Sequence, residues 1–294
     1  MELRHRRKMI LDGPDYPAPA KLNLFLHVVG QRPDGYHLLQ TVFRLLDFGD
    51  VLRFRVRPDG VINRVNPLHN VPVEVDLTVR AAYSLQRAAN ISMGVDIELV
   101  KHLPVGGGVG GGSSDAATTL LALNHLWKAG LSRSRLMEIG LTLGADVPVF
   151  IYGRSSFAEG IGERLQPIDL PVAWYVVLTP SISVSTKEIF TDFELTRNTK
   201  PITFTGFSAG REMSNIGHND LQLVVVKHYP EIGRYLAWLR QFGDARMTGS
   251  GASVFCAFDS KSLANEVLNK LPPDMKGFVA AGYDRHPLFG LAED

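Results

Sequence analysis

The stretch LPVGGGVGGGSSDAATT, residues 103–119, holds six glycines within the seven positions from Gly106 to Gly112. It follows the alternating segment 95–101, which predicts a strand, and it precedes a helical pattern over 113–128. Glycine has no Cβ atom, so the backbone can take positive φ values and come close to a ligand. Several N–H groups and the positive end of the helix can then bind one anion. The stretch therefore predicts a phosphate-binding loop rather than a flexible linker.

Three kinds of phosphate loop have to be distinguished. A Walker A loop needs a lysine where this chain has Ser113. A dinucleotide fingerprint fits the glycine spacing, but it requires a second strand after the helix, and here a second helical pattern follows at 133–143. The third form is a proline, a glycine triplet with further glycines, and a final Ser-Ser. Residues 104–114 fit this third form.

The rest of the chain predicts an α+β protein. Residues 18–30 alternate, with Lys21 and Asn23 on one face and leucines on the other, which indicates a half-buried strand. Further expected elements are two strands over 39–57 joined at Gly49-Asp50, helices at 77–90 and 133–143, strands near 155–160 and 172–178, a long connection over 196–218, helices at 219–228 and 231–242, a strand-turn-strand at 245–258, a helix at 260–270 and a strand at 277–283. This order favours two domains with a boundary between 153 and 172.

Composition limits the classes of function. The chain has 294 residues, 45% hydrophobic and 21% charged, which is typical of a soluble globular protein. A formal net charge of +1 gives no global attraction to nucleic acid or to anionic membranes. No apolar stretch approaches the roughly 20 residues of a membrane span. The basic N-terminus is followed by too few apolar residues for a signal peptide, so residues 1–16 predict a flexible, solvated tail.

Cysteine and histidine usage argues against metal and disulfide sites. The only cysteine, Cys256, lies in the apolar sequence VFCAF and predicts a core residue. An intramolecular disulfide and a cysteine-based zinc site are therefore excluded, and a reducing cytoplasm fits. The nine histidines show no metal-binding spacing, so we expect no structural metal.

Three segments in the right order resemble the GHMP kinases. The glycine stretch resembles the second motif of that superfamily, PAKLNLFLHVVGQRPDGYHLLQT (19–41) the first, and RMTGSGASVFCAF (246–258) the third. The resemblance implies a two-domain fold. The N-terminal domain (17–160) would be like domain 2 of ribosomal protein S5 and the C-terminal domain (161–294) ferredoxin-like. It also implies ATP as phosphate donor, accompanied by Mg²⁺.

Within this superfamily the chain is similar to the branch that phosphorylates the 2-hydroxyl of 4-diphosphocytidyl-2-C-methyl-D-erythritol in the non-mevalonate isoprenoid pathway. The discriminating segments are GQRPDGYH (30–37), LTLGADVPVF (141–150) and FAEGIGE (157–163). Two alternatives stay open. The chain could be another GHMP kinase with a different alcohol acceptor, or a GHMP-fold binding protein that has lost catalysis. We expect a cytoplasmic enzyme with a small-molecule substrate, without nucleic acid or membrane partners.

The resemblance also assigns roles to residues. Asp146, fixed between Gly144 and Pro148, matches the family's catalytic aspartate, and Lys21 matches the lysine beside that aspartate and the acceptor hydroxyl. Tyr36, His37 and Phe190 are implied to bind cytidine, and Thr186 and Asn23 the methylerythritol part. ATP is implied to contact Lys101, Pro104, Val105, Gly106, Gly107, Gly108, Val109, Gly110, Gly111, Gly112, Ser113 and Ser114. The chain departs from the family at Asp76-Leu77, where Asn-Leu is usual near the adenine.

Overall fold

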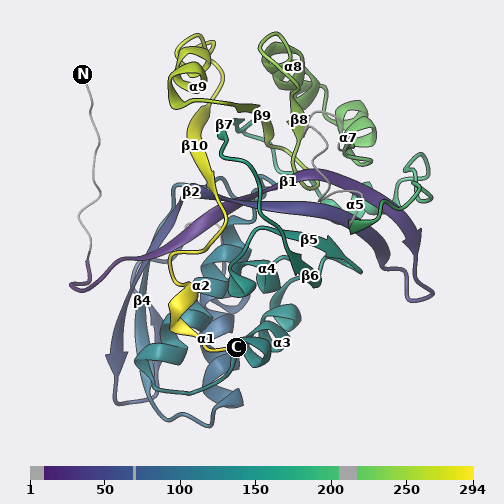
Figure 1. Cartoon of the computed structure of the whole chain (residues 1–294). Coiled ribbons are helices and arrows are strands. Elements are labelled where there is room, and N and C mark those ends of the chain that lie inside the picture. The colour runs from purple at the N-terminus through teal and green to yellow at the C-terminus, as the bar shows by residue number, and fades with distance from the viewer. Residues whose placement is uncertain (1–9, 69–70, 205–216) are drawn as a thin grey trace.

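A long antiparallel ribbon crosses the whole molecule. The computed structural model describes residues 10–68, 71–204 and 217–294. Strands β1 (Tyr16–Gln31) and β2 (His37–Arg57) form the ribbon. Figure 1 shows the helices within residues 77–152 on one side of it and the helices within residues 222–268 on the other. Strand β1 therefore has protein on both faces and is buried along most of its length, whereas the sequence predicted a half-buried strand.

The N-terminal half consists of a sheet and the helices below it. Strand β4 pairs with residues 51–57 of β2 and with the short β3. Strand β5 pairs with residues 41–43 of β2 and with β6. Alanines and leucines of α2 pack against α1, α3 and α4 in one large apolar cluster. The elements are β3 (Ile62–Arg64), η1 (Val73–Val75), α1 (Leu77–Ala88), β4 (Gly94–Val100), α2 (Gly111–Leu126), α3 (Arg133–Leu143), α4 (Val147–Tyr152), β5 (Ser156–Glu159) and β6 (Arg164–Pro167).

The C-terminal half has the predicted ferredoxin-like arrangement. Its strands lie in the order β10-β7-β9-β8, and helices follow the first and the third strand along the chain. The elements are β7 (Trp174–Leu178), α5 (Thr186–Thr191), α7 (Gln222–His228), α8 (Pro230–Leu239), β8 (Arg246–Met247), β9 (Val254–Phe258), α9 (Lys261–Leu268), β10 (Gly277–Tyr283) and η3 (Phe289–Leu291). Cys256 is a core residue here, and burial raises the pKa of its thiol to about 12.

Strand β10 connects the two halves. Residues 277–281 pair with β7, and Gly282 and Tyr283 pair with β2. The chain then returns to the N-terminal half, where Ala292 belongs to the same apolar cluster as α2. The division predicted after residue 160 falls in the turn between β5 and β6 and stays a prediction. The contacts themselves show that the segment after β10 packs with the helices of the first half.

The turn predicted at Gly49-Asp50 does not exist. Residues 37–57 form one continuous strand, in which Gly49 pairs with Pro19. A Cβ atom on Gly49 would lie 2.1 Å from the carbonyl oxygen of Ala18, so glycine is needed here for close approach of two strands. Gly49 is therefore required for close strand contact, whereas the local sequence indicated a turn.

The described part of the predicted tail packs against the rest of the protein. Leu11 is 2% exposed, and the N–H groups of Ile10 and Leu11 each donate to the Glu98 carboxylate at 2.8 Å. The described part, residues 10–15, is therefore docked against β4 before β1 begins. Residues 1–9, and residues 205–216 of the predicted connection, lie outside the described residues. Within residues 10–68, 71–204 and 217–294, no helix has the length and apolar character of a membrane span.

Arg133 holds the C-terminal segment. It begins α3, is 4% exposed, and its Nε donates to the Asp294 carboxylate at 2.6 Å. The two terminal nitrogens of its guanidinium donate to the carbonyl oxygens of Ile151, Phe289 and Ala292 at 2.6 to 2.8 Å. One side chain therefore joins α3, α4 and the last residues of the chain.

We expect Arg133→Met to lower the free energy of unfolding by about 2–4 kcal/mol, because buried carbonyl groups lose a charged donor. Urea unfolding followed by circular dichroism measures this loss. Arg135→Met is the matched control, since Arg135 lies on the exposed side of α3 and forms an exposed ion pair with Glu138. Equal stability of the two variants would contradict a role for Arg133 in holding the C-terminal segment.

Candidate active site

A buried lysine lies at the centre of the site. Lys21, on β1, is 2% exposed and forms an ion pair with Asp146, with 3.1 Å between Nζ and Oδ2. Its Nζ also donates to the Asn23 side chain, as expected for two residues on one strand face. Its backbone N–H donates to the carbonyl oxygen of Val109 in the glycine loop. Lys21 therefore links the loop to the carboxylate of Asp146.

Asp146 precedes a short helix that the sequence did not predict. It occupies the N-cap position of α4, with Pro148 in the first turn, but its side chain makes no capping hydrogen bond. Its carboxylate instead faces Lys21 and is 39% exposed. A carboxylate that is partly exposed and fixed by the backbone can accept a proton from a bound hydroxyl.

The glycine loop is held in place by both halves of the protein. Gly108 has a φ of +75°, and a Cβ atom there would lie 2.6 Å from the carbonyl oxygen of Thr248. The backbone N–H of Ser253 donates to the Gly107 carbonyl oxygen, and Val109 is completely buried. The glycines thus permit close packing against residues 248–253 as well as access to a ligand. Helix α2 begins within the glycine run, at Gly111.

Two cavities meet at Asp146. The larger, about 940 Å³, is called the acceptor cavity here and extends from Lys21 to the α5 region. The smaller, about 390 Å³, is called the loop cavity and is bordered by the glycine loop and the start of α1. Four residues line both cavities: Ser113, Asp146, Thr186 and Ser250. A group in one cavity can therefore react with a group in the other beside the Asp146 carboxylate.

The residues assigned to ATP by resemblance mostly line the loop cavity, namely Lys101, Pro104, Val105, Gly106, Gly107, Gly108, Gly110, Gly111, Gly112 and Ser113. Val109 and Ser114 do not. The Val109 side chain packs in the apolar core, and Ser114 is fully buried, with its backbone N–H bonded to the Gly110 carbonyl oxygen. These two residues support the loop from behind.

Lys101 belongs to a charge cluster that the sequence did not reveal. Its Nζ contacts Oδ2 of Asp50 at 2.5 Å and Oδ2 of Asp115 at 2.9 Å. The other Asp50 oxygen accepts the backbone N–H groups of His102 and Leu103. Burial raises the pKa of Asp115 to about 8, against the opposing charge of Lys101. The cluster fixes the strand end that leads into the loop.

Asp76, where the family usually has asparagine, is used within the protein. It caps α1 by accepting the backbone N–H and the hydroxyl of Thr78, and it pairs with Arg64. Burial raises the pKa of this carboxyl, but Thr78 and Arg64 outweigh that effect and hold the pKa below its usual range. The residue lines the loop cavity with both carboxylate oxygens already engaged.

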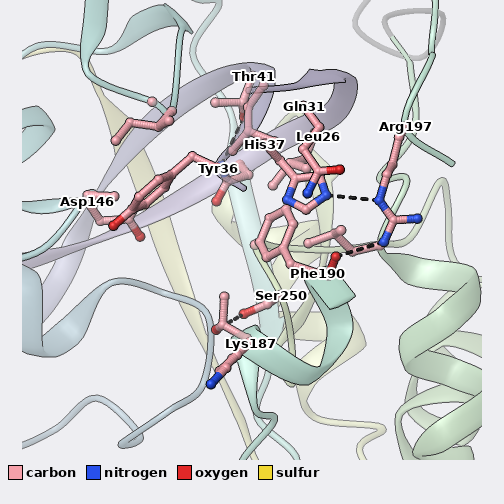
Figure 2. A pocket seen from close by; sticks show the side chains of 18 of the residues that line it. Leu26, Gln31, Tyr36, His37, Thr41, Asp146, Lys187, Phe190, Arg197 and Ser250 are labelled. Atoms are coloured by element: carbon pink, nitrogen blue, oxygen red, sulfur yellow. Dashed lines mark hydrogen bonds between the residues drawn. The ribbon is translucent and has the colours of Figure 1, made fainter. Parts of the chain in front are cut away.

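All five residues assigned to the acceptor by resemblance line the acceptor cavity: Asn23, Tyr36, His37, Thr186 and Phe190. The His37 and Phe190 rings are in contact, with centroids 5.0 Å apart, and Tyr36 is 59% exposed at the turn before β2 (Figure 2). Thr186 is hydrogen-bonded to Ser250 at 2.8 Å. The structure thus brings together residues from β1, β2 and α5 around one space.

The sequence analysis missed three residues of this site. The Thr248 hydroxyl accepts a hydrogen bond from the backbone N–H of Asn23 at 2.8 Å and so positions that residue. Ser250 lines both cavities. Arg197 contacts His37 from the predicted connection. Thr248 and Ser250 lie in the third motif, which was a usable signal, whereas nothing periodic marks Arg197. Within the described residues, no group of three or more His, Cys, Asp or Glu side chains is placed to hold a metal ion.

Comparisons with known proteins agree with this geometry. Residues 76–154 match the family of GHMP kinases N terminal domain, and residues 207–276 match GHMP kinases C terminal. A protein of Thiobacillus denitrificans named 4-diphosphocytidyl-2-C-methyl-D-erythritol kinase is 60% identical over 95% of this chain and 99% of its own. A protein of Nitrosospira multiformis with the same name is 59% identical over 94% of each chain.

Solved structures of GHMP kinases share this fold. A crystal structure of 4-(cytidine 5'-diphospho)-2C-methyl-D-erythritol kinase matches with a TM-score of 0.78 and 32% identity, over 92% of this chain and 99% of that one. A crystal structure of mevalonate kinase matches with a TM-score of 0.65 over 92% of this chain and 99% of that one. At 15% identity, the second similarity shows the fold alone.

The loop cavity can be tested at Gly112. A Cβ atom there would meet only the flexible end of Leu77, at 3.4 Å, so Gly112→Val keeps the fold while its side chain obstructs the loop cavity. We expect ATP affinity to fall at least about tenfold, a loss of roughly 1.4 kcal/mol, as measured by calorimetry. Gly290→Val, at a position with open space, is the control. Unchanged ATP affinity of Gly112→Val would place the nucleotide elsewhere. Gly108→Val is unsuitable because it would clash with the Thr248 backbone.

Proposed function

The chain belongs to the 4-diphosphocytidyl-2-C-methyl-D-erythritol kinase family of the GHMP kinases, and we propose that Asp146 and Lys21 carry out its reaction where the two cavities meet. It is a phosphotransferase that moves the γ-phosphate of ATP to the 2-hydroxyl of 4-diphosphocytidyl-2-C-methyl-D-erythritol, in isoprenoid synthesis. The observation that supports the proposal most strongly is that Asp146 lines both cavities and is paired with the buried Lys21.

Asp146 acts as the general base. Its carboxylate accepts the proton of the acceptor hydroxyl as that oxygen attacks the γ-phosphorus, and ADP leaves with the electron pair of the broken P–O bond. Lys21 keeps the carboxylate oriented and provides positive charge near the transferred phosphoryl group. Because Lys21 is almost completely buried, its charge is poorly screened by water and acts strongly over this short distance.

The glycine loop and the start of α2 bind the ATP phosphates. Their backbone N–H groups supply donors that need no side chain, and the N-terminal end of α2 favours negative charge. Ser113 lines the loop cavity and offers a hydroxyl oxygen, which suits the oxygen preference of Mg²⁺. When Mg²⁺ accompanies the nucleotide, it neutralises phosphate charge.

The acceptor cavity holds the substrate by its two ends. Asn23 and Thr186 lie near Asp146 and suit the hydroxyl-rich methylerythritol. Tyr36, His37 and Phe190 offer ring faces and a polar ring edge, which suit a stacked pyrimidine base. The reaction uses small molecules, and the single buried Cys256 suits a reducing cytoplasm.

Acceptor profiling tests the proposed function. ADP release, followed by a coupled assay, should occur with 4-diphosphocytidyl-2-C-methyl-D-erythritol and be negligible with mevalonate, homoserine and galactose. Preference for one of the other alcohols would make the chain a GHMP kinase of different specificity. No turnover of any alcohol by folded, ATP-binding protein would indicate a binding protein.

Asp146→Asn removes the base and keeps the size of the side chain. We expect kcat to fall about 100-fold or more with little change in substrate affinity, because proton transfer acts mainly in the transition state. Steady-state kinetics and equilibrium binding measure the two effects. Asp274→Asn is the control, as Asp274 is exposed, forms an ion pair with Arg234 and lines neither cavity. Near-normal turnover by Asp146→Asn would remove Asp146 from this role.

Phe190→Ala tests whether the enzyme recognises the cytosine base of the acceptor. Stacking on an aromatic ring contributes about 1–3 kcal/mol per base, so we expect kcat/KM for the cytidine substrate to fall about 10- to 100-fold while the KM for ATP stays unchanged. The wild-type enzyme should also disfavour a purine analogue of the acceptor by roughly 100-fold. Equal turnover of cytidine and purine acceptors by the wild type would show that the base is not recognised.

A further inference from the structure

Arg197 lines the acceptor cavity beside the aromatic residues His37 and Phe190. Its Nε donates to Nε2 of His37 at 3.0 Å. One terminal nitrogen donates to the carbonyl oxygens of Phe190 and Asp192 at 2.9 and 2.7 Å, and the other to that of Leu195 at 3.1 Å. Figure 2 shows two of these contacts, those to His37 and to Phe190, meeting at one guanidinium at the edge of the cavity. Arg197 therefore fixes both the end of α5, which carries Phe190, and the His37 ring.

The contact with His37 determines where the imidazole carries its proton. An arginine guanidinium only donates hydrogen bonds, so Nε2 of His37 must be the accepting nitrogen. Burial lowers the pKa of His37, and the positive charge of Arg197 lowers it further, so the ring is neutral at pH 7. A neutral ring with an accepting Nε2 carries its single proton on Nδ1. Figure 2 shows this nitrogen on the side of the ring turned away from Arg197.

We propose that Arg197 is the positioning residue that sets the base preference of the acceptor cavity, because its bond to Nε2 keeps a donor N–H on Nδ1 of His37. This inference rests on the proposed function, in which His37 lies beside the base. A donor on Nδ1 matches the lone pair at N3 of cytosine. It opposes the N–H at the same position of uracil, where two donors would face each other. Arg197 thereby selects a cytidine over a uridine acceptor through the imidazole proton of His37.

The contacts of the same segment supply a matched control. Lys227 of α7 pairs with Glu194 at 2.5 Å and so holds the segment between Asp192 and Leu195 from the other side. Lys227 is exposed and does not line the acceptor cavity. Lys227→Met thus loosens this segment without removing the donor to His37. If Arg197 acts only by holding this segment, Lys227→Met should weaken the discrimination between cytidine and uridine acceptors as Arg197→Met does. If Arg197 acts through the imidazole proton, only Arg197→Met should weaken it.

The test combines nuclear magnetic resonance with kinetics. Long-range ¹H–¹⁵N spectra of the whole chain, with the His37 signals assigned through His37→Gln, report which ring nitrogen is protonated. Kinetics compare the cytidine acceptor with its uridine analogue. We expect Nδ1–H in the wild type and in Lys227→Met. In Arg197→Met we expect a measurable share of Nε2–H and a loss of at least about tenfold in the cytidine-to-uridine ratio of kcat/KM. The KM for ATP should not change, and Arg197→Lys should restore part of the ratio.

Each result decides the inference. An Nε2–H or doubly protonated His37 in the wild type overturns it, even if Arg197→Met fails to fold. An unchanged ratio in Arg197→Met, an equal loss in Lys227→Met, or equal turnover of cytidine and uridine acceptors by the wild type also overturns it. These outcomes leave the proposed function intact as long as the cytidine acceptor is phosphorylated and the purine analogue is disfavoured by roughly 100-fold. Failure of that last comparison counts against the proposed function instead.

Discussion

The buried charge of Lys21 is the constraint on which the rest of the site depends. An ammonium group that is 2% exposed needs an opposite charge and hydrogen-bond acceptors, since an uncompensated buried charge is strongly destabilising. Asp146 and Asn23 supply them, and the Lys21 backbone holds the glycine loop through Val109. Folding therefore brings Asp146, Lys21 and the glycine loop together, because the contacts that compensate the buried charge also join these three parts of the chain.

The two halves of the chain share the phosphate loop. Gly108 packs against the carbonyl oxygen of Thr248, and the Thr248 hydroxyl accepts the backbone N–H of Asn23 on β1. Asn219 donates to the carbonyl oxygens of Met247 and Gly249, which fixes the same turn from the C-terminal side. The turn in the third motif, residues 248–251, thus borders both cavities. The position of this turn relative to the glycine loop depends on how β10 and β1 join the two halves.

Local periodicity predicted most helices and strands. It failed where tertiary packing, rather than local sequence, determines the conformation of a residue. The helix expected at 133–143 has these bounds, and the strands at 277–283 and 95–101 are found within a residue. Gly49 failed as a turn signal because its missing Cβ serves strand contact. The helix after Asp146 was missed because six residues, all but one buried, are too few to show a helical period.

The sequence by itself determined the α+β order of elements and, through three motifs, the family. It proposed the glycine-rich stretch as an anion-binding loop and, through motif resemblance, Lys21 and Asp146 as catalytic residues. These features are encoded over short spans, where periodicity and spacing can be recognised. Tertiary structure alone decided that Lys21 is buried, that two cavities meet at Asp146, and that Arg197 reaches His37 across 160 positions. Such contacts depend on which faces of distant elements pack together, and the local pattern carries no information about that.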